Sequence, residues 1–179
     1  ETTKEQASLF LSQADFVFHL GGVNRPKGLD NFQNGNVDLT SYVVETLESH
    51  GRHVPLVLSS SAQVEQDNEY GKSKLAAEKE VKDYSKRTGA PHYIYRLPNV
   101  FGKWCKPSYN SFVATFCYNV MHGVELSIHD PNAEVSLVHI DDVCESFLDF
   151  LSEMPRSNYP VVYPEYSATV GEVAALISS

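Results

Sequence analysis

Residues 54–97 read VPLVLSSSAQVEQDNEYGKSKLAAEKEVKDYSKRTGAPHYIYRL, and this stretch decides the fold. The apolar run at 54–58 is typical of a buried strand, and the Lys-, Glu- and Ala-rich run at 70–88 predicts a helix that ends at Gly89. A second strand is expected at 92–97, after Pro91. A strand, a helix and a strand in this order predict a right-handed crossover between parallel strands.

The same alternation continues on the N-terminal side of this stretch. The expected elements there are a helix at 3–13, a strand at 15–20 that stops at Gly21-Gly22, and a helix at 31–49. Repeated strand and helix units predict a parallel sheet with helices on both faces. We therefore expect an α/β fold of the doubly wound Rossmann type.

The C-terminal part has a less regular pattern. The expected elements are helices at 111–121 and 141–151, short strands at 125–128 and 134–138, and a last helix that opens at the capping box Thr169–Glu172 and is cut off at Ser179. We expect residues 1–102 to form the sheet domain and residues 103–179 to form a smaller α+β part, with the true domain continuing beyond the last residue.

Composition excludes several classes of protein. The 179 residues are 42% hydrophobic, which suits one globular domain or part of a larger one. A net charge of -9 without a basic stripe argues against nucleic-acid binding, and no apolar run approaches the roughly 20 residues needed to cross a bilayer. Cys105, Cys117 and Cys144 lack metal-binding spacing, so we expect no metal site and a reduced, cytoplasmic setting.

Tyr70 and Lys74 are the strongest candidates for chemistry. Their spacing of four places both side chains on one face of the predicted helix. The reference pKa of a phenol is about 10, and a neighbouring cation favours the phenolate, so the pair suits acid and base catalysis. Ser61, at the end of the preceding strand, offers a hydroxyl to a substrate oxygen. For the bare Tyr-x-x-x-Lys spacing, the alternative is a solvated helix face.

Each predicted strand ends in a distinctive run, as expected where reactive groups gather at the carboxyl ends of parallel strands. The runs are Leu20-Gly21-Gly22, Ser59-Ser60-Ser61 and Leu97-Pro98-Asn99-Val100-Phe101-Gly102. Glycines let a ligand approach the backbone closely, and a simple turn is the alternative. We expect His19 to be a buried structural residue, and Asp141 and Asp142 to begin a helix.

These runs carry a family resemblance. Residues 18–26, the three serines, Tyr70-x-x-x-Lys74 and residues 96–102 follow in the order found in the extended short-chain dehydrogenase/reductase family of nucleotide-sugar enzymes, and residues 139–143 resemble a later element of that family. The resemblance covers nearly the whole chain. Residues 22–26, the short gap from Ser61 to Tyr70 and residues 101–107 are similar to the UDP-sugar reductases of capsular polysaccharide synthesis.

The resemblance implies an activity. Such reductases use NADPH to reduce the 4-keto group of a UDP-linked 2-acetamido-2,6-dideoxy sugar, on the route to UDP-N-acetyl-L-fucosamine. They also carry a C-terminal cupin domain that epimerises C3, which these 179 residues do not include. The same resemblance implies a homodimer and leaves NAD possible in place of NADP.

The resemblance also implies roles for individual residues. Tyr70 is the acid and base, Lys74 lowers its pKa and holds the nicotinamide ribose, and Ser61 hydrogen-bonds the reacting oxygen. The implied cofactor contacts are Leu20, Gly21, Gly22, Ser59, Tyr70, Lys74 and Pro98, and the implied UDP-sugar contacts are Asn99, Lys103, Trp104 and Asn110. Lys103 can pair with a diphosphate and Trp104 can stack on a ring; the alternatives are a surface lysine and a core tryptophan.

One departure from the family concerns the cofactor. The chain contains neither G-x-x-G-x-x-G nor G-x-G-x-x-G, although a glycine-rich loop at a helix N-terminus is the main pyrophosphate site. We expect the first strand and its loop to precede Glu1, so that these residues alone bind NADPH weakly and leave an apolar sheet edge at 16–20. Two alternatives to the reductase stay open, a C4 epimerase and a non-catalytic nucleotide-sugar or cofactor-binding scaffold, whereas the absence of an Asp-Glu pair after the serines argues against a dehydratase.

Overall fold

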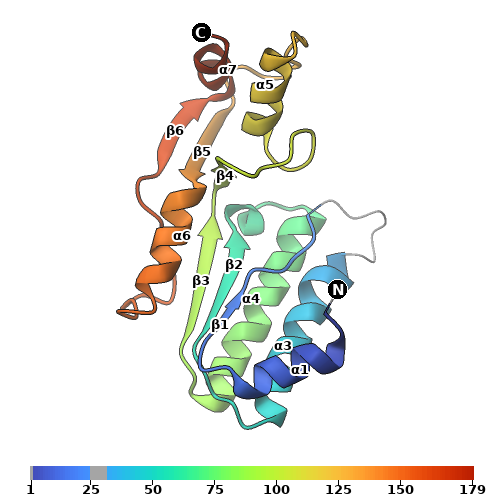
Figure 1. Ribbon diagram of the computed structural model, residues 1–179, viewed down its shortest axis with the longest axis vertical. Coiled ribbons are helices and arrows are strands. Elements are labelled where there is room, and N and C mark those ends of the chain that lie inside the picture. The colour runs from blue at the N-terminus through green and yellow to red at the C-terminus, as the bar shows by residue number, and fades with distance from the viewer. Residues whose placement is uncertain (1, 25–31) are drawn as a thin grey trace. The chain divides into compact units, whose positions relative to one another are not determined.

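The computed structural model describes residues 2–24 and 32–179 and forms two compact units (Figure 1). The first unit contains Glu1–Arg96 together with Arg156–Val161, and the second contains Leu97–Pro155 together with Val162–Ser179. The segment 156–161 therefore returns to the first unit after the chain has built most of the second. The division into cofactor and substrate parts after Gly102 stays a prediction.

The first unit contains a three-stranded sheet. Its strands are β1 (Val17–His19), β2 (Leu56–Ser61) and β3 (His92–Leu97), in the order β1-β2-β3. β1 and β2 are parallel, with Val17 opposite Leu56, as the alternating pattern predicted. β1 has one neighbour in this sheet, so it is an edge strand of the described residues.

The helices of this unit follow the predicted pattern closely. They are α1 (Lys4–Gln13), the π-helical turn η1 (Gln33–Asp38), α3 (Leu39–Ser49), the short 3-10 helix η2 (Ala62–Glu65) and α4 (Glu69–Thr88). α3 and α4 lie against the sheet and α1 packs on α3 (Figure 1). The helix predicted at 31–49 is correct for 33–49 except that its first turn is π-helical, and residue 31 lies outside the described residues.

Local signals explain where these helices begin and end. The Thr3 side chain accepts a hydrogen bond from the Gln6 N–H and completes a capping box at the start of α1. The Asn68 side chain caps α4 by accepting from the Gly71 N–H at 2.7 Å. Gly89 ends α4 in the left-handed conformation, with φ of 75°, which glycine adopts without steric cost.

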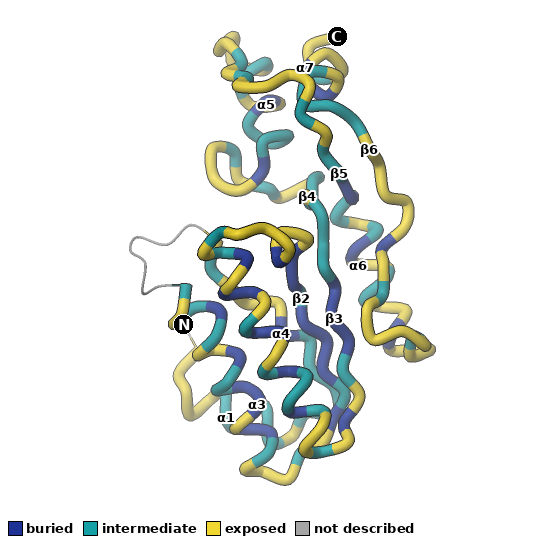
Figure 2. Tube along the Cα trace, turned by 180° about the vertical axis from the view of Figure 1, so that it is seen from behind, coloured by how far each residue is buried: buried dark blue, intermediate teal, exposed yellow. Residues whose placement is uncertain are grey.

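The hydrophobic core lies between α3, α4 and the sheet, where Figure 2 shows continuous buried segments. Its members are apolar side chains from both layers: Val43, Val44, Leu47, Val54, Leu56, Leu58, Ala77, Val81, Tyr84, Ala90 and Ile94. Because β2 is the central strand, its apolar run is almost fully buried, as its composition predicted.

The second unit is a mixed sheet with three helices. Its elements are β4 (Asn99–Phe101), α5 (Phe112–Met121), β5 (Glu134–His139), α6 (Ile140–Asp149), β6 (Tyr166–Thr169) and α7 (Val170–Ser178). β4 pairs with β5 in parallel, and β5 pairs with β6 antiparallel. The capping box at Thr169 and Glu172 is present and opens α7, as predicted.

Some strand assignments differ between the prediction and the structure. Residues 125–128, expected as a strand, lie outside helices and strands. The short strands β4 and β6 were not predicted, because they owe their extended conformation to pairing with β5 rather than to a local pattern. β2 begins at Leu56 and includes the three serines at its end, whereas the predicted bounds were 54–58. In the part of the chain that is described, no helix combines the length and apolarity that crossing a membrane requires.

A buried polar chain joins β1 to the helical layer. The Thr40 hydroxyl donates to the Asn36 carbonyl oxygen at 2.6 Å, so its oxygen accepts the 2.9 Å hydrogen bond from His19 Nε2. Burial, with a smaller contribution from the charge of Lys74, lowers the pKa of His19 to about 4. His19 is therefore neutral and hydrogen-bonded at neutral pH, in the structural role expected of it.

This histidine predicts a pH dependence of stability. Its pKa is about 4 in the folded chain and 6.5 ordinarily, so below pH 6.5 the unfolded chain binds a proton that the folded chain does not. Stability is then lost as the pH falls from 6.5 through 4. We expect the free energy of unfolding of the wild type to fall by about 2 kcal/mol more than that of His19→Gln between pH 7 and pH 4.5, measured by urea unfolding.

The carboxylates titrate in both proteins, so their contribution to the change in stability cancels in the comparison between the wild type and His19→Gln. Equal losses of stability in the wild type and in His19→Gln would show that His19 takes up its proton without unfolding.

Candidate functional site

The three predicted catalytic residues lie in the first unit, on β2 and α4. Ser61 is the last residue of β2, and its side chain caps η2 by accepting from the Gln63 N–H at 3.2 Å. Tyr70 and Lys74 belong to the first half of α4, one turn apart on the same face. The strand end and the helix start thus bring a hydroxyl, a phenol and an ammonium into one region.

Tyr70 is half-buried, and the Ser61 hydroxyl is near enough to act on the pKa of its phenol. Burial raises the pKa of Tyr70, the Ser61 hydroxyl lowers it, and the net direction is upward. This direction is opposite to the one expected from Lys74 alone, because loss of water around the phenol is the larger effect. The phenol is therefore protonated at neutral pH and can donate a proton.

Lys74 is a buried lysine, with 6% of its surface exposed. Its Nζ donates a 2.6 Å hydrogen bond to the backbone oxygen of Ser59, at the end of β2. Burial lowers the pKa of Lys74 to about 8, and the charge of Glu78 opposes this change. An ammonium group has three N–H donors, and the Ser59 carbonyl uses one of them, so Lys74 can also donate to a ligand.

The turn after β1 approaches Lys74 through bare backbone. A Cβ atom on Gly22 would lie 2.9 Å from the Asn36 side-chain oxygen and 3.6 Å from Lys74 Nζ. Gly21 and Gly22 are exposed, and more than half of the Leu20 surface is exposed. The exposed backbone leaves room for a flat ligand against this turn, and the predicted contact with a dinucleotide stays a prediction.

Asn36 holds this turn in place. Its side-chain oxygen accepts from the Val23 N–H at 2.7 Å, and its side-chain nitrogen donates to the Val23 oxygen at 2.8 Å and to the Ser73 hydroxyl at 2.9 Å. Asn36 and Ser73 were not singled out from the sequence. An asparagine in a predicted helix carries no local signal that its amide is buried and reaches another segment.

Gly71 allows η2 to approach α4. A Cβ atom there would collide with the Gln63 carbonyl oxygen and lie 2.9 Å from the Gln66 oxygen. The glycine is thus required by close packing between helices, although it sits inside a helix that otherwise favours larger residues. Because η2 follows Ser61 directly, this approach also determines how close Ser61 lies to Tyr70.

The other residues implied by the resemblance belong to the second unit, and their roles stay predictions. Pro98 is half-buried before β4, and the Asn99 side chain donates to the Ser136 oxygen at 3.1 Å. Lys103 forms an ion pair with Asp141 at 3.0 Å, and Asn110 is exposed in a turn. Trp104 is 95% exposed, so it is not a core tryptophan. Within the described residues, no group of three or more His, Cys, Asp or Glu is placed to hold a metal ion.

Several known proteins are similar to this chain in sequence and in fold. A UDP-2-acetamido-2,6-beta-L-arabino-hexul-4-ose reductase of Pseudomonas aeruginosa is 46% identical over 165 residues, which are 92% of this chain and 44% of that protein. The crystal structure of the capsular polysaccharide assembling protein CapF from Staphylococcus aureus matches with a TM-score of 0.85 and 37% identity, over 99% of this chain and 47% of that one. A UDP-glucuronic acid 4-epimerase from Bacillus cereus, at 18% identity and a TM-score of 0.81 over 95% of this chain and 60% of that one, supports the fold alone.

The chain spans less than half the length of the reductase and of CapF. These matches confirm a Rossmann-type fold and the resemblance to extended short-chain dehydrogenase/reductase enzymes. Residues 2–162 also match the profile described as the NAD dependent epimerase/dehydratase family. The chain therefore belongs to the NAD dependent epimerase/dehydratase family.

Proposed function

We propose that the protein containing this chain reduces the 4-keto group of a UDP-linked 2-acetamido-2,6-dideoxy-hexos-4-ulose with NADPH, in the synthesis of a capsular or O-antigen polysaccharide precursor. The observation that carries the proposal is the grouping of Ser61, Tyr70 and Lys74 at the junction of β2 and α4. The 46% identity to a reductase of this substrate class supports it. By the same resemblance, we propose a cytoplasmic homodimer.

Tyr70 supplies the proton in this proposal. Reduction of a ketone creates negative charge on the sugar oxygen, and a protonated phenol beside that oxygen can neutralise it. Burial raises the pKa of Tyr70, so the phenol keeps its proton until the oxygen becomes basic enough to take it. Ser61 hydrogen-bonds the same oxygen and orients the phenol, and the nearby cation of Lys74 favours the phenolate that remains.

NADPH, when bound, supplies the hydride. The exposed turn of Leu20, Gly21 and Gly22 would lie along the dinucleotide, and Lys74 has donors for a ribose hydroxyl. Ser59 and Pro98 would complete the contacts to the cofactor. We propose NADP over NAD by resemblance to the reductases, and parallel assays with NADPH and NADH distinguish the two.

Residues of the second unit are proposed to bind the UDP-sugar. Trp104 offers an almost fully exposed ring for stacking, and more than half of the Lys103 side chain is exposed for pairing with a diphosphate. Asn99 and Asn110 are exposed amides that suit hydroxyl and carbonyl groups of the ligand.

Replacement of the phenol tests the proposed proton donor. In the complete gene product that contains this chain, we expect Tyr70→Phe to slow single-turnover oxidation of NADPH by a UDP-4-keto-6-deoxy-N-acetylhexosamine by about 10²–10⁴-fold, because the variant lacks the donated proton. The decay of NADPH absorbance measures the rate. Tyr42→Phe is the matched control, since Tyr42 also lies in the first unit and donates to the Lys4 oxygen, on α1.

Equal rates in Tyr70→Phe and Tyr42→Phe would remove Tyr70 from the mechanism. If the wild type does not consume NADPH with the 4-keto sugar but interconverts UDP-N-acetylhexosamines that differ only in the configuration of the C4 hydroxyl, the epimerase replaces the reductase. If the wild type binds the sugar without changing it chemically, the non-catalytic scaffold replaces the reductase.

Gly71 provides a test of the packing beneath the site. A glycine-to-alanine change inside a helix ordinarily stabilises it by up to about 1 kcal/mol. At Gly71 we expect the reverse, a loss of about 1–3 kcal/mol in the free energy of unfolding, because the added methyl group meets carbonyl oxygens of η2 and its C-cap. Urea unfolding measures the change, and Lys72→Ala, at the next and more exposed position, is the control. A stabilised Gly71→Ala protein would contradict the close approach of η2 to α4.

A further inference from the structure

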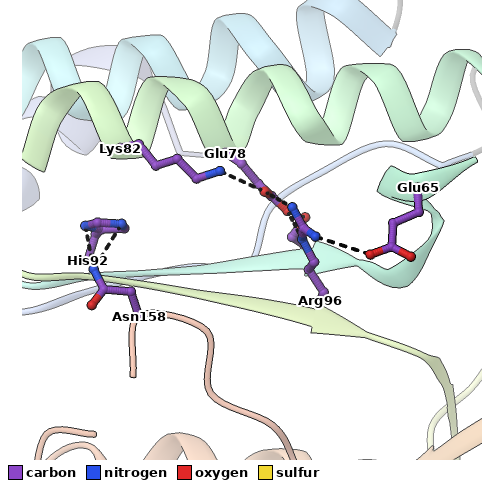
Figure 3. Close-up of polar contacts among 7 residues, drawn as sticks. Glu65, Glu78, Lys82, His92, Arg96 and Asn158 are labelled. Carbon is purple, nitrogen blue, oxygen red and sulfur yellow. Dashed lines mark hydrogen bonds and ion pairs between the residues drawn. The ribbon is translucent and has the colours of Figure 1, made fainter. Parts of the chain in front are cut away.

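A buried carboxylate lies just behind the candidate site. Glu78, on α4, has 0% of its surface exposed. One of its oxygens accepts from the Ser60 hydroxyl at 2.7 Å and from Arg96 Nε at 3.0 Å, and the other accepts from an Arg96 nitrogen at 2.9 Å and from Lys82 at 3.3 Å. Figure 3 shows Arg96, from β3, reaching Glu78 on one side and Glu65 on the other.

The outer side of this ion pair is covered by the returning segment. The Tyr159 ring lies 5.2 Å from the Arg96 guanidinium and 5.4 Å from Lys82 Nζ. The Asn158 oxygen accepts from the Ile94 N–H at 2.8 Å and so holds this segment to β3. Glu78 therefore bonds directly to side chains from β2, β3 and α4. It is linked to residues 156–161 through Arg96 and Lys82, which contact the Tyr159 ring.

Stability alone does not account for a charge in this position. Removing a carboxylate from water costs several kcal/mol, and well packed apolar side chains of similar size are often as stable as a buried ion pair. What an apolar pair cannot supply is the directional bond to Ser60. That bond ties the Ser60 side chain to α4 one residue before Ser61, in a strand whose side chains alternate between the two faces.

We propose that Glu78 is a positioning residue of the catalytic site, which holds the end of β2 against α4 through Ser60 so that the Ser61 hydroxyl stays in contact with the Tyr70 phenol. The inference rests on the proposed function for its kinetic consequences. The contact between Ser61 and Tyr70 can be measured without activity.

The position of Glu78 relative to Lys74 supports the same role. Glu78 lies one turn after Lys74 on α4, and its charge raises the pKa of Lys74 against the larger, opposite effect of burial. From β1, His19 faces this lysine as a neutral group, since burial lowers the pKa of His19 to about 4. Glu78 therefore acts on the strand that carries Ser61 and on the Lys74 ammonium.

The test compares two ways of breaking the link. Ser60→Ala removes one hydrogen bond and leaves the ion pair with Arg96 intact. The double variant Glu78→Met with Arg96→Met replaces the whole pair by apolar side chains and avoids an unpaired buried charge. Asp83→Asn is the control, because Asp83 also forms ion pairs on α4, with Lys79 and Lys86, but does not contact β2.

The first measurement is the ¹³Cζ resonance of Tyr70 at pH 7, in the complete protein with labelled tyrosine, assigned by its loss in Tyr70→Phe. Ser61→Ala defines the position of this resonance without the serine hydroxyl. We expect Ser60→Ala and the double variant to move the resonance toward that position and Asp83→Asn to leave it unchanged. A wild-type resonance in both test variants would overturn the proposal, whatever the activity of the protein.

The second measurement is steady-state kinetics with the UDP-4-keto sugar. We expect kcat to fall about tenfold in Ser60→Ala and about a hundredfold in the double variant, with KM within about threefold, because misplacement of a catalytic group affects the chemical step more than binding. A purely structural role predicts instead that a double variant with the wild-type unfolding midpoint also has the wild-type kcat. An inactive wild type would reject the proposed reductase, while the resonance would still decide the role of Glu78.

Discussion

The hydrogen bond from Lys74 Nζ to the Ser59 oxygen, 2.6 Å long, is the contact on which the candidate site depends. It joins the helix that carries Tyr70 to the strand that carries Ser61, at the point where both face the turn after β1. β2 is the central strand of its sheet, and its apolar side chains pack into the core. The hydrogen bond from Lys74 holds the serine part of the strand to α4. The cost of burying this ammonium is visible in its pKa, which falls to about 8.

The helix and strand nearest this contact could be predicted from the sequence. The bounds of α4 and β3 agree with the prediction to within one residue, because their signals are local: an asparagine cap, a left-handed glycine and an uninterrupted β-rich run. The grouping of Ser61 with Tyr70 and Lys74 was also predictable. The rule that reactive groups gather at the carboxyl ends of parallel strands indicated Ser61, and the spacing of four on the helix that follows indicated Tyr70 and Lys74.

The features that could not be predicted from the sequence depend on contacts between distant segments. β4 and β6 are three and four residues long and are stabilised by pairing with β5. Strands this short have no sequence periodicity from which they could be predicted. The three serines extend β2 beyond Leu58, where its pairing with β1 ends. The direction of the Tyr70 pKa was mispredicted for the same reason: the sequence shows the neighbouring cation, whereas burial depends on the assembled fold. The role of Asn36 likewise requires two segments to meet.

The exposure of Trp104 determines its fluorescence. With φ of 68°, this residue adopts the left-handed conformation that bulky side chains rarely adopt, and its indole is almost wholly in water. It is also the single tryptophan of these 179 residues. A molecule that covered the ring would shift its fluorescence emission to shorter wavelengths. The chain thus carries an intrinsic, unlabelled reporter at one of the positions proposed to contact the sugar nucleotide.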